Sequence, residues 1–325
     1  MRVLLTGGAG FIGHHIVEQL LRVTDWEIVL LDRLEHGGNL NRLAEVLTAT
    51  AARQRVAWQF HDLRAPLSTQ LVKQIGPVDV VLHVAAATHV DRSIAAPLDF
   101  VWDNVLGTAH ILEYARQVGV GKFVFFGTDE VFGPAPEGTA YREWDRYNSG
   151  NPYSATKAGA EELSVAYRNT YKLPVIVTHT MNVFGERQHP EKYIPMTIRK
   201  VRDGERVTVH ASADRTKAGS RFYIHAHNVV SALLFLLEKG EVGEKYNIVG
   251  EREVDNLELA RMIAAIQNRP LDYEMVDFHS ARPGHDLRYA LSGEKMATMG
   301  WKLPLNFEVA LEQVVHWTLR NTNWL

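Results

Sequence analysis

The chain has 325 residues, of which 46% are hydrophobic and 22% charged, and its formal net charge is −3. These values are ordinary for a globular protein, and the absence of any long basic run argues against nucleic acid as a partner. There is no cysteine, which excludes disulfides, thiolate metal sites and cysteine nucleophiles.

The first half of the chain alternates short apolar runs with amphipathic stretches, a pattern that predicts a parallel sheet with crossover helices. The chain opens directly on a strand, without the layout of a signal peptide, and no later run is long enough to span a membrane, so we expect a cytoplasmic protein. The expected strands are Arg2–Thr6, Glu27–Asp32, Val56–His61, Val78–Val84, Phe123–Gly127 and Val175–Thr178. The expected helices are Ile12–Leu21, Asn104–Val118 and Ala155–Asn169. Most of the strands are apolar throughout, as strands covered on both faces are.

After Phe184 the regular alternation is lost, because Pro190, Pro195 and the polar stretch 211–220 interrupt it. Later segments with helical periodicity or strand character are Val229–Leu237, Tyr246–Val249, Leu257–Ile266 and Phe307–Leu319. The second half therefore predicts a smaller mixed lobe.

A glycine-rich turn joins the first strand to the first helix. Gly7, Gly10 and Gly13 have the spacing G-x-x-G-x-x-G, and glycine there permits a tight turn, close approach of the backbone to a pyrophosphate, and close helix–strand packing. The pattern predicts an α/β fold of the Rossmann type, a doubly wound parallel sheet with a smaller mixed α/β substrate-binding lobe. We place the nucleotide-binding domain at 1–180 and 222–250, and the lobe at 181–221 and 251–325.

Asp32 ends the second strand, 19 residues after Gly13. At that position a carboxylate accepts hydrogen bonds from the hydroxyls of the adenosine ribose and repels a 2′-phosphate, which favours NAD over NADP. Arg33 follows directly and would be able to bind the 2′-phosphate of NADP, so the preference between the two cofactors stays open at this point.

Tyr153 and Lys157 lie four residues apart, on one face of a predicted helix, and Thr128 ends a predicted strand upstream. A neighbouring ammonium group and a nicotinamide cation would lower the pKa of the tyrosine, so that it serves as a base. An ordinary amphipathic helix carries the same spacing by chance, but the glycine turn and Thr128 favour the catalytic interpretation.

Several motifs resemble those of the extended short-chain dehydrogenase/reductases, in particular the members that dehydrate sugar nucleotides such as dTDP-glucose. The motifs are T-D-E-V-F-G at 128–133, H-V-A-A-A-T-H-V-D-R-S at 83–93, P-E-K-Y-I-P at 190–195 after Asn182, R-P-G-H-D at 282–286 and N-T-N-W at 321–324. Gly127 and Thr88 depart from the pattern, in which serine and glutamate stand at these positions.

The resemblance implies a sugar-nucleotide 4,6-dehydratase. Tyr153, supported by Lys157 and Thr128, would take the C4 hydroxyl proton while NAD takes the hydride. Glu130 would then remove the C5 proton and Asp129 would protonate the departing C6 hydroxyl, after which the hydride returns to C6. One alternative is a sugar-nucleotide 4-epimerase, which needs no second acid–base pair and is therefore disfavoured by Asp129 and Glu130. Another is a protein that binds NAD without catalysis.

The same resemblance assigns the remaining site residues. Cofactor contacts are expected at Gly7, Gly10, Phe11, Ile12, Gly13, Asp32, Asp62, Leu63, Ala85, Ala86, Asn104, Tyr153 and Lys157. Contacts with the sugar nucleotide are expected at His89, Asn182, Lys192, Tyr193, Thr208, His210, Arg221, Asn247, Arg282 and His285, with the two arginines on the diphosphate.

Three further expectations concern partners and loops. We expect no metal, and interpret His225 and His227 as structural histidines. We expect a homodimer formed through the helices at 104–118 and 155–169. Arg215 and Lys217, in the stretch 211–220, are either close to the diphosphate and Arg221 or simply solvated.

Overall fold

The computed structural model describes residues 1–35, 37–278 and 287–325. They form two units, the first made of Met1–Val131, Asn151–His179 and Leu233–Tyr246, and the second of Phe132–Gly150, Thr180–Ala232 and Asn247–Leu325. This division differs from the predicted domain boundaries at 132–150, 180, 222–232 and 247–250, which group with the second unit.

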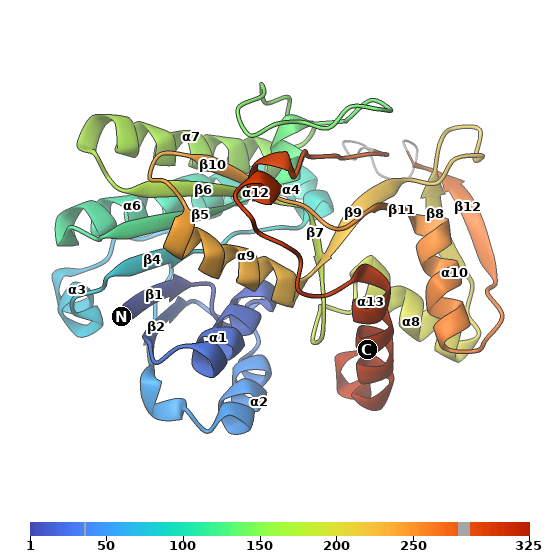
Figure 1. The fold of residues 1–325 in the computed structure, drawn as a ribbon, viewed down its shortest axis with the longest axis horizontal. Coiled ribbons are helices and arrows are strands. Elements are labelled where there is room, and N and C mark those ends of the chain that lie inside the picture. The colour runs from blue at the N-terminus through green and yellow to red at the C-terminus, as the bar shows by residue number, and fades with distance from the viewer. Residues whose placement is uncertain (36, 279–286) are drawn as a thin grey trace. The chain divides into compact units, whose positions relative to one another are not determined.

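A seven-stranded sheet is the framework of the first unit, with the strand order β10-β6-β5-β4-β1-β2-β3 (Figure 1). β1 is parallel to β2 and β4, β2 to β3, and β4 to β5. The predicted fold class, a Rossmann-type parallel sheet, is thereby confirmed. The strands are β1 Arg2–Thr6, β2 Glu27–Asp32, β3 Val56–Phe60, β4 Val80–His83, β5 Lys122–Thr128, β6 Val175–Thr180 and β10 Lys245–Ile248.

Helices cover this sheet. Leu71, Ile111 and Ala160, from three different helices, share one buried cluster with strand residues such as Leu4 and Phe123. These helices therefore pack on the same face. The helices are α1 Phe11–Val23, α2 Leu40–Thr50, α3 Thr69–Ile75, α4 Val90–Ala95, α5 Pro97–Phe100, α6 Gly107–Val118, α7 Pro152–Tyr171 and α9 Ala226–Lys239, with short turns η1 Arg53–Arg55, η2 Val101–Leu106 and η3 Asp129–Phe132.

The starts of α6 and α7 differ from the predicted bounds in ways that the local structure explains. The helix predicted from Asn104 is preceded by the π-helical turn η2, and α6 proper begins at Gly107. α7 begins three residues before the predicted start, at Pro152, because Asn151 and Ser154 form a capping box and a proline is well suited to a first helical position.

The second unit contains small sheets with helices packed on them. β9 is parallel to β7 and antiparallel to β11, while β8 and β12 form a separate parallel pair. Phe184, Ile198, Leu259 and Phe307 belong to one of its buried clusters. Its elements are β7 Asn182–Phe184, α8 Tyr193–Asp203, β8 Val207–Ala211, β9 Ser220–His225, β11 Glu253–Asp255, α10 Asn256–Ile266, β12 Tyr273–Asp277, α12 Glu294–Thr298, α13 Phe307–Arg320 and η4 Thr322–Trp324.

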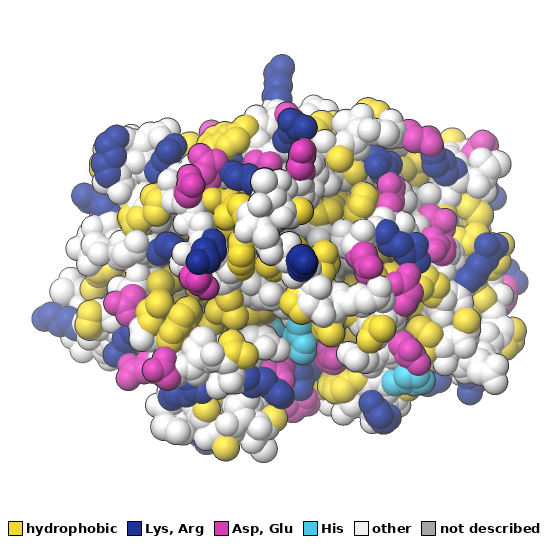
Figure 2. Space-filling view, in the orientation of Figure 1, with side chains coloured by type: hydrophobic (Ala, Val, Ile, Leu, Met, Phe, Trp, Pro, Cys, Tyr) yellow, Lys and Arg dark blue, Asp and Glu magenta, His cyan; other side chains and the backbone are white. Residues whose placement is uncertain are grey.

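The surface carries charges of both signs. In Figure 2 the Lys and Arg side chains are interspersed with Asp and Glu over the face in view, as a formal net charge of −3 leads one to expect. Along the described parts of the chain, none of the helices is both long enough and apolar enough to cross a membrane.

Candidate active site

The glycine turn between β1 and α1 leaves no room for side chains. Gly7 has a φ of +75°, and a Cβ added to it would lie 2.9 Å from the backbone of Ala85. A Cβ on Gly13 would lie 2.0 Å from the carbonyl oxygen of Gly7. Gly10 caps α1 without a side-chain hydrogen bond, and Phe11 and Ile12 form the first helical residues. A bare backbone at a helix N-terminus suits the pyrophosphate of a dinucleotide, so the turn fits NAD.

Asp32 lies at the end of β2, beside this turn. It is 9% exposed, and its carboxylate accepts hydrogen bonds from the N–H groups of Ala9 at 2.9 Å and Leu34 at 2.8 Å. These two bonds fix the carboxylate and leave it acceptor capacity for ribose hydroxyls. The structure thus brings Asp32 and the glycine turn together, as expected.

Asp62 and Leu63 follow β3, the strand next to β2. The Asp62 carboxylate accepts hydrogen bonds from the backbone N–H of Arg64 at 2.9 Å and from the Arg33 guanidinium at 3.2 Å. The carbonyl of Leu63 accepts one from His110 at 2.7 Å. Both residues therefore lie at the same edge of the sheet as Asp32.

Asn104 is almost fully buried and holds the loop after β4 in place. Its side-chain oxygen accepts from the N–H of Ala87 at 2.8 Å, and its amide nitrogen donates to the Ala87 carbonyl at 3.1 Å and to Thr156 Oγ1 at 3.0 Å. The loop that contains Ala85 and Ala86 is thereby tied to α7. Because its amide is occupied in this way, Asn104 orients the expected cofactor residues rather than presenting a free amide.

The predicted catalytic residues come from three elements of the first unit. Thr128 ends β5, Asp129 and Glu130 follow in η3, and Tyr153 and Lys157 occupy the first turns of α7. The Thr128 hydroxyl donates to Asp129 Oδ1 at 3.2 Å. Asn151, the cap of α7, donates to Glu130 Oε2 at 3.5 Å.

Two contacts set the position of Tyr153 and Lys157. The backbone N–H of Tyr153 donates to Ser93 Oγ at 3.1 Å, which explains why the motif at 83–93 ends in serine. The Lys157 ammonium donates to the carbonyl of Phe126 at 2.7 Å and lies 4.4 Å from the centre of the Phe125 ring. Both side chains are buried, with 6% and 5% exposed.

The pKa of Tyr153 differs from the expectation. Burial and the charges of Glu130 and Asp129 raise the pKa of Tyr153, although its hydrogen bond with Thr128 acts in the opposite direction. The expected lowering by Lys157 is therefore not produced by the described residues. Burial also lowers the pKa of Lys157 to about 8, against the opposing charge of Glu161.

Two groups of charged residues in the first unit were not anticipated from the sequence. Glu161, one turn after Lys157, is fully buried between Lys245 at 2.9 Å and His179 at 3.0 Å. Asp103 joins Arg33 and Arg64, each at 2.6 Å. The sequence shows only that Glu161 lies one helical turn after Lys157. The partners of Glu161 and of Asp103 are distant along the chain and are brought together by the fold.

Gly127, one of the departures from the family pattern, is explained by packing. A Cβ at this position would lie 2.5 Å from the carbonyl oxygen of Thr178. No real Cβ approaches a backbone atom so closely, so a serine would force β5 and β6 to shift. His89, also in the first unit, caps α4, where its ring nitrogen accepts from the N–H of Arg92 at 3.4 Å.

In the second unit the expected substrate residues lie on several elements. Asn182 begins β7 and is exposed, and Lys192, also exposed, caps α8. The hydroxyl of Tyr193 donates to the carbonyl of Asn256 at 2.7 Å, and burial raises its pKa. Thr208 and His210 alternate with the buried residues of β8 and so share its other face. Thr208 donates to Glu274 at 3.4 Å, and the His210 ring meets Phe278 edge-on at 5.6 Å.

Arg221 and Asn247 are used to hold the second unit together. The Arg221 guanidinium donates to the carbonyls of Ser220 and Leu287, both at 2.7 Å, and lies over the Tyr289 ring. The Asn247 amide donates to the carbonyls of Tyr141 and Ser292, both at 3.1 Å. Arg282 and His285 lie outside the described residues.

The stretch 211–220 forms a hydrogen-bonded turn between β8 and β9. The N–H of Ser212 donates to the carbonyl of Lys217 at 2.8 Å. The Lys217 ammonium pairs with exposed Glu137 at 2.9 Å. Lys217 therefore has a carboxylate partner of its own on the surface.

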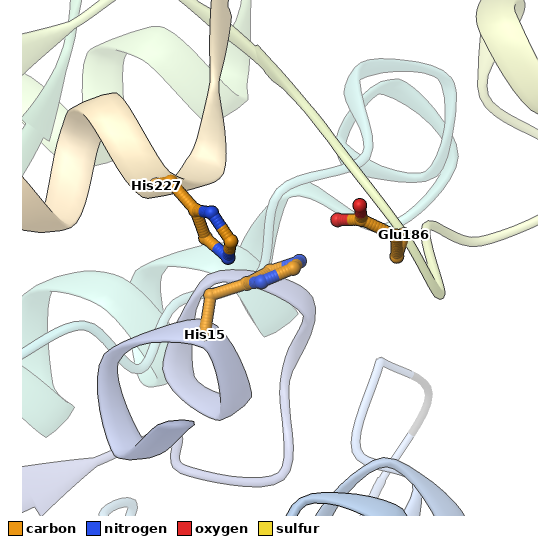
Figure 3. A group of neighbouring side chains, drawn as sticks. All are labelled: His15, Glu186 and His227. Carbon is orange, nitrogen blue, oxygen red and sulfur yellow. The ribbon is translucent and has the colours of Figure 1, made fainter. Parts of the chain in front are cut away.

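The histidines at the end of β9 have partners within the second unit. His225 Nε2 lies 3.4 Å from Glu186 Oε2, and the rings of His225 and His227 are in edge-on contact at 4.9 Å. Figure 3 shows that Glu186 comes from the segment after β7 and His227 from the start of α9, and it also draws His15 of α1, in the first unit. Glu186 gave no signal in the sequence.

Comparisons with known proteins bear directly on this site. Residues 3–249 match the model of the family described as "NAD dependent epimerase/dehydratase family". The dTDP-D-glucose 4,6-dehydratase of Mus musculus is 36% identical over 99% of this chain and 90% of its own length. The low-salt glycan biosynthesis protein Agl12 of Haloferax volcanii is 38% identical over 98% and 99%.

A solved structure is similar over the full length. The dTDP-glucose 4,6-dehydratase from Streptomyces venezuelae, crystallised with NAD, is 35% identical, covers 100% of this chain and 98% of its own, and superposes with a TM-score of 0.90. The resemblance inferred from the motifs is thereby confirmed, as is the dependence on NAD that it implied. This chain belongs to the NAD dependent epimerase/dehydratase family.

Proposed function

We propose that this protein is an NAD-dependent 4,6-dehydratase that converts an NDP-hexose resembling dTDP-glucose into the NDP-4-keto-6-deoxyhexose. The single observation that carries the proposal is the pair Asp129 and Glu130, held directly after Thr128 at the end of β5 and beside Tyr153. The relatives named as dTDP-glucose 4,6-dehydratases support it, because they match the chain over its whole length.

The cofactor would be held by the glycine turn at its pyrophosphate and by Asp32 at its adenosine ribose, with the loop 85–87 fixed by Asn104. When bound, NAD supplies a reversible acceptor for the hydride that leaves C4 and returns to C6. Its positive charge would also favour the phenolate form of Tyr153, whose pKa is raised by burial and by the carboxylates of Glu130 and Asp129.

The acid–base steps fall to three side chains. Tyr153 takes the proton of the C4 hydroxyl as the C4 hydride leaves, which gives a 4-keto sugar. The ketone acidifies C5, so that Glu130 removes the C5 proton while Asp129 protonates the C6 hydroxyl and water departs. Hydride then adds to C6 and Glu130 returns its proton to C5. The proton gained by Tyr153 and the one lost by Asp129 balance, so the net change is loss of one water.

The alternative is a sugar-nucleotide 4-epimerase, a reaction that the family name also covers. An epimerase oxidises C4 and returns the hydride there, so it has no use for Asp129 and Glu130. A protein that binds NAD without catalysis is disfavoured by the buried arrangement of Thr128, Tyr153 and Lys157.

As residues that contact the sugar nucleotide we propose His89, Asn182, Lys192, Tyr193, Thr208, His210, Arg221 and Asn247. The proposal extends to a homodimer that acts in the cytoplasm. Exposed Leu98, Trp102 and Tyr171, on or next to the helices at 104–118 and 155–169, would be covered in such a dimer.

Mass spectrometry of the product distinguishes the two reactions. The purified protein is incubated with dTDP-glucose, UDP-glucose, CDP-glucose and GDP-glucose in separate reactions. A product lighter than its substrate by one water supports the dehydratase. An isomer of unchanged mass from any of the four sugar nucleotides supports the epimerase instead.

A further inference from the structure

An ion-pair network lies at the end of β2, immediately beside Asp32. The guanidinium of Arg33 donates to both oxygens of Asp103, at 2.6 and 2.8 Å, in the bidentate arrangement that makes such pairs strong. It also donates to Asp62 at 3.2 Å, and its Nε pairs with Glu35 at 2.8 Å. All three nitrogens of the Arg33 guanidinium are therefore directed at carboxylates.

Asp103 is the central member of this network. Only 9% of its side chain is exposed, and it accepts a further hydrogen bond from Arg64 Nε at 2.6 Å. Burial raises the pKa of the Asp103 carboxyl, but hydrogen bonds from Arg64 and Arg33 outweigh burial, so that its pKa lies below its ordinary value. Asp103 is thus a fixed anion that holds two guanidinium groups.

The backbone at Asp103 is itself held in place. Asp103 belongs to the π-helical turn η2, and the next residue, Asn104, is bonded to Ala87 and Thr156. The parallel strands β2 and β3 end at the same edge of the sheet, which brings Arg33 and Asp62 to this turn. The network is therefore set by the fold rather than by chance contact of surface chains.

The adenosine end of the cofactor is where NAD and NADP differ. NADP carries a phosphate on the ribose hydroxyl that Asp32 is placed to bind, and this phosphate has a charge of about −1.5 to −2. A free guanidinium next to Asp32 is the group that would bind it. Around Arg33 and Arg64, however, the carboxylates of the described residues outnumber the guanidinium groups by two. The carboxylates are Asp32, Glu35, Asp62 and Asp103.

We propose that Asp103 is a specificity-determining residue, which keeps the site selective for NAD by holding Arg33 away from the position of a 2′-phosphate. Arg33 would be able to bind the 2′-phosphate of NADP, but its guanidinium is paired with Asp103 instead. Removing the charge of Asp103 would release Arg33 to a phosphate and would take one anion from its surroundings. The affinity for NADP relative to NAD should then rise, by about tenfold to a hundredfold for one charge-assisted bidentate contact.

The test measures dinucleotide binding and needs no sugar. Wild-type protein and the variant Asp103→Asn are equilibrated with equal concentrations of NAD⁺ and NADP⁺, separated from free ligand by gel filtration, and the retained dinucleotides are quantified by mass spectrometry. Thermal unfolding with ADP or with adenosine 2′,5′-bisphosphate gives a second readout. The matched control is Glu27→Gln, which removes a carboxylate paired with Arg2 at 3.6 Å at the other end of β2.

In Asp103→Asn we expect the retained NADP⁺:NAD⁺ ratio to rise at least about tenfold above that of the wild type. The double variant Asp103→Asn/Arg33→Met should show the wild-type ratio again, and so should the control Glu27→Gln. A ratio unchanged in a folded Asp103→Asn, or a rise that survives the loss of Arg33, would overturn the proposal. If Asp103→Asn does not fold, the single variant Arg33→Met tests the proposal. Its NADP⁺:NAD⁺ ratio should equal that of the wild type. A lower ratio would show that Arg33 already binds the 2′-phosphate in the wild type and would overturn the proposal. The inference rests on the proposed function only for the binding of a dinucleotide, so it fails separately from the assignment of the reaction.

Discussion

Replacing Lys157 by methionine should stabilise the protein near neutral pH while it abolishes catalysis. The Lys157 side chain is 5% exposed, and its ammonium donates a hydrogen bond to the carbonyl of Phe126 at 2.7 Å. Methionine has a similar length, and its sulfur would pack against the Phe125 ring that now lies below the ammonium.

The size of the effect follows from the pKa of Lys157. Burial lowers it from 10.5 to about 8, even though Glu161 acts in the opposite direction. The unfolded chain therefore binds this proton more tightly than the folded one, so the buried charge destabilises the fold fully below about pH 8, and the penalty disappears as the pH rises toward 10.5. About 1.4 kcal/mol per pKa unit gives a penalty of about 3 kcal/mol. Loss of the hydrogen bond subtracts about 1 kcal/mol, so the net gain for the methionine variant at pH 7 is about 2 kcal/mol.

Chemical unfolding of Lys157→Met and of the wild type at pH 7 and pH 10 measures this difference. The control is Lys122→Met, because the Lys122 ammonium also donates to a backbone carbonyl, that of Leu237 at 2.7 Å, from a less buried position. The advantage of Lys157→Met should shrink or reverse at pH 10, and Lys122→Met should show no such change. A loss of stability at pH 7 as large as that at pH 10 would show that the buried charge of Lys157 does not destabilise the fold.

Three further variants test the roles assigned to the site. Asp129→Asn should still oxidise C4 but eliminate water slowly, so that reduced cofactor accumulates as an absorbance increase after substrate is added. Tyr153→Phe should give no such absorbance, and wild-type rates in both variants would contradict the assignment. Gly13→Ala should lose bound NAD, because its Cβ would lie 2.0 Å from the carbonyl oxygen of Gly7. Gly37→Ala should retain it, because among the described residues, chain neighbours aside, no heavy atom lies within 4 Å of the added Cβ. Equal NAD content in these two glycine variants would count against the role of the turn.

The sheet could be predicted from the sequence because its signals are local. The strands Arg2–Thr6 and Glu27–Asp32 have the predicted bounds, since each is a short apolar run that ends at a polar or glycine-rich turn. The spacing of the glycines and their distance in sequence to Asp32 are set within one β–α–β unit, so the cofactor-binding turn could be predicted as well. Tyr153 and Lys157 are separated by one helical turn, which places them together in any helix.

The remaining features depend on distant contacts or on backbone geometry. The partners Arg33 and Asp103 are 70 residues apart, and nothing in either segment indicates that the π-helical turn η2 aims one at the other. Arg221 and Asn247 were expected to contact substrate, but their side chains donate hydrogen bonds to the backbone carbonyls of Leu287 and Tyr141, which are distant in the sequence and cannot be predicted from its patterns. The raised pKa of Tyr153 likewise follows from burial and from carboxylates placed by the fold.

The most direct test of the proposed reaction follows the hydrogen at C4. Wild-type protein is incubated with dTDP-glucose that carries deuterium at C4, and the product is analysed by mass spectrometry and NMR. We expect a 4-keto sugar that has lost one water and carries the deuterium in its C6 methyl group. An epimeric product of unchanged composition, with the deuterium still at C4, would contradict it.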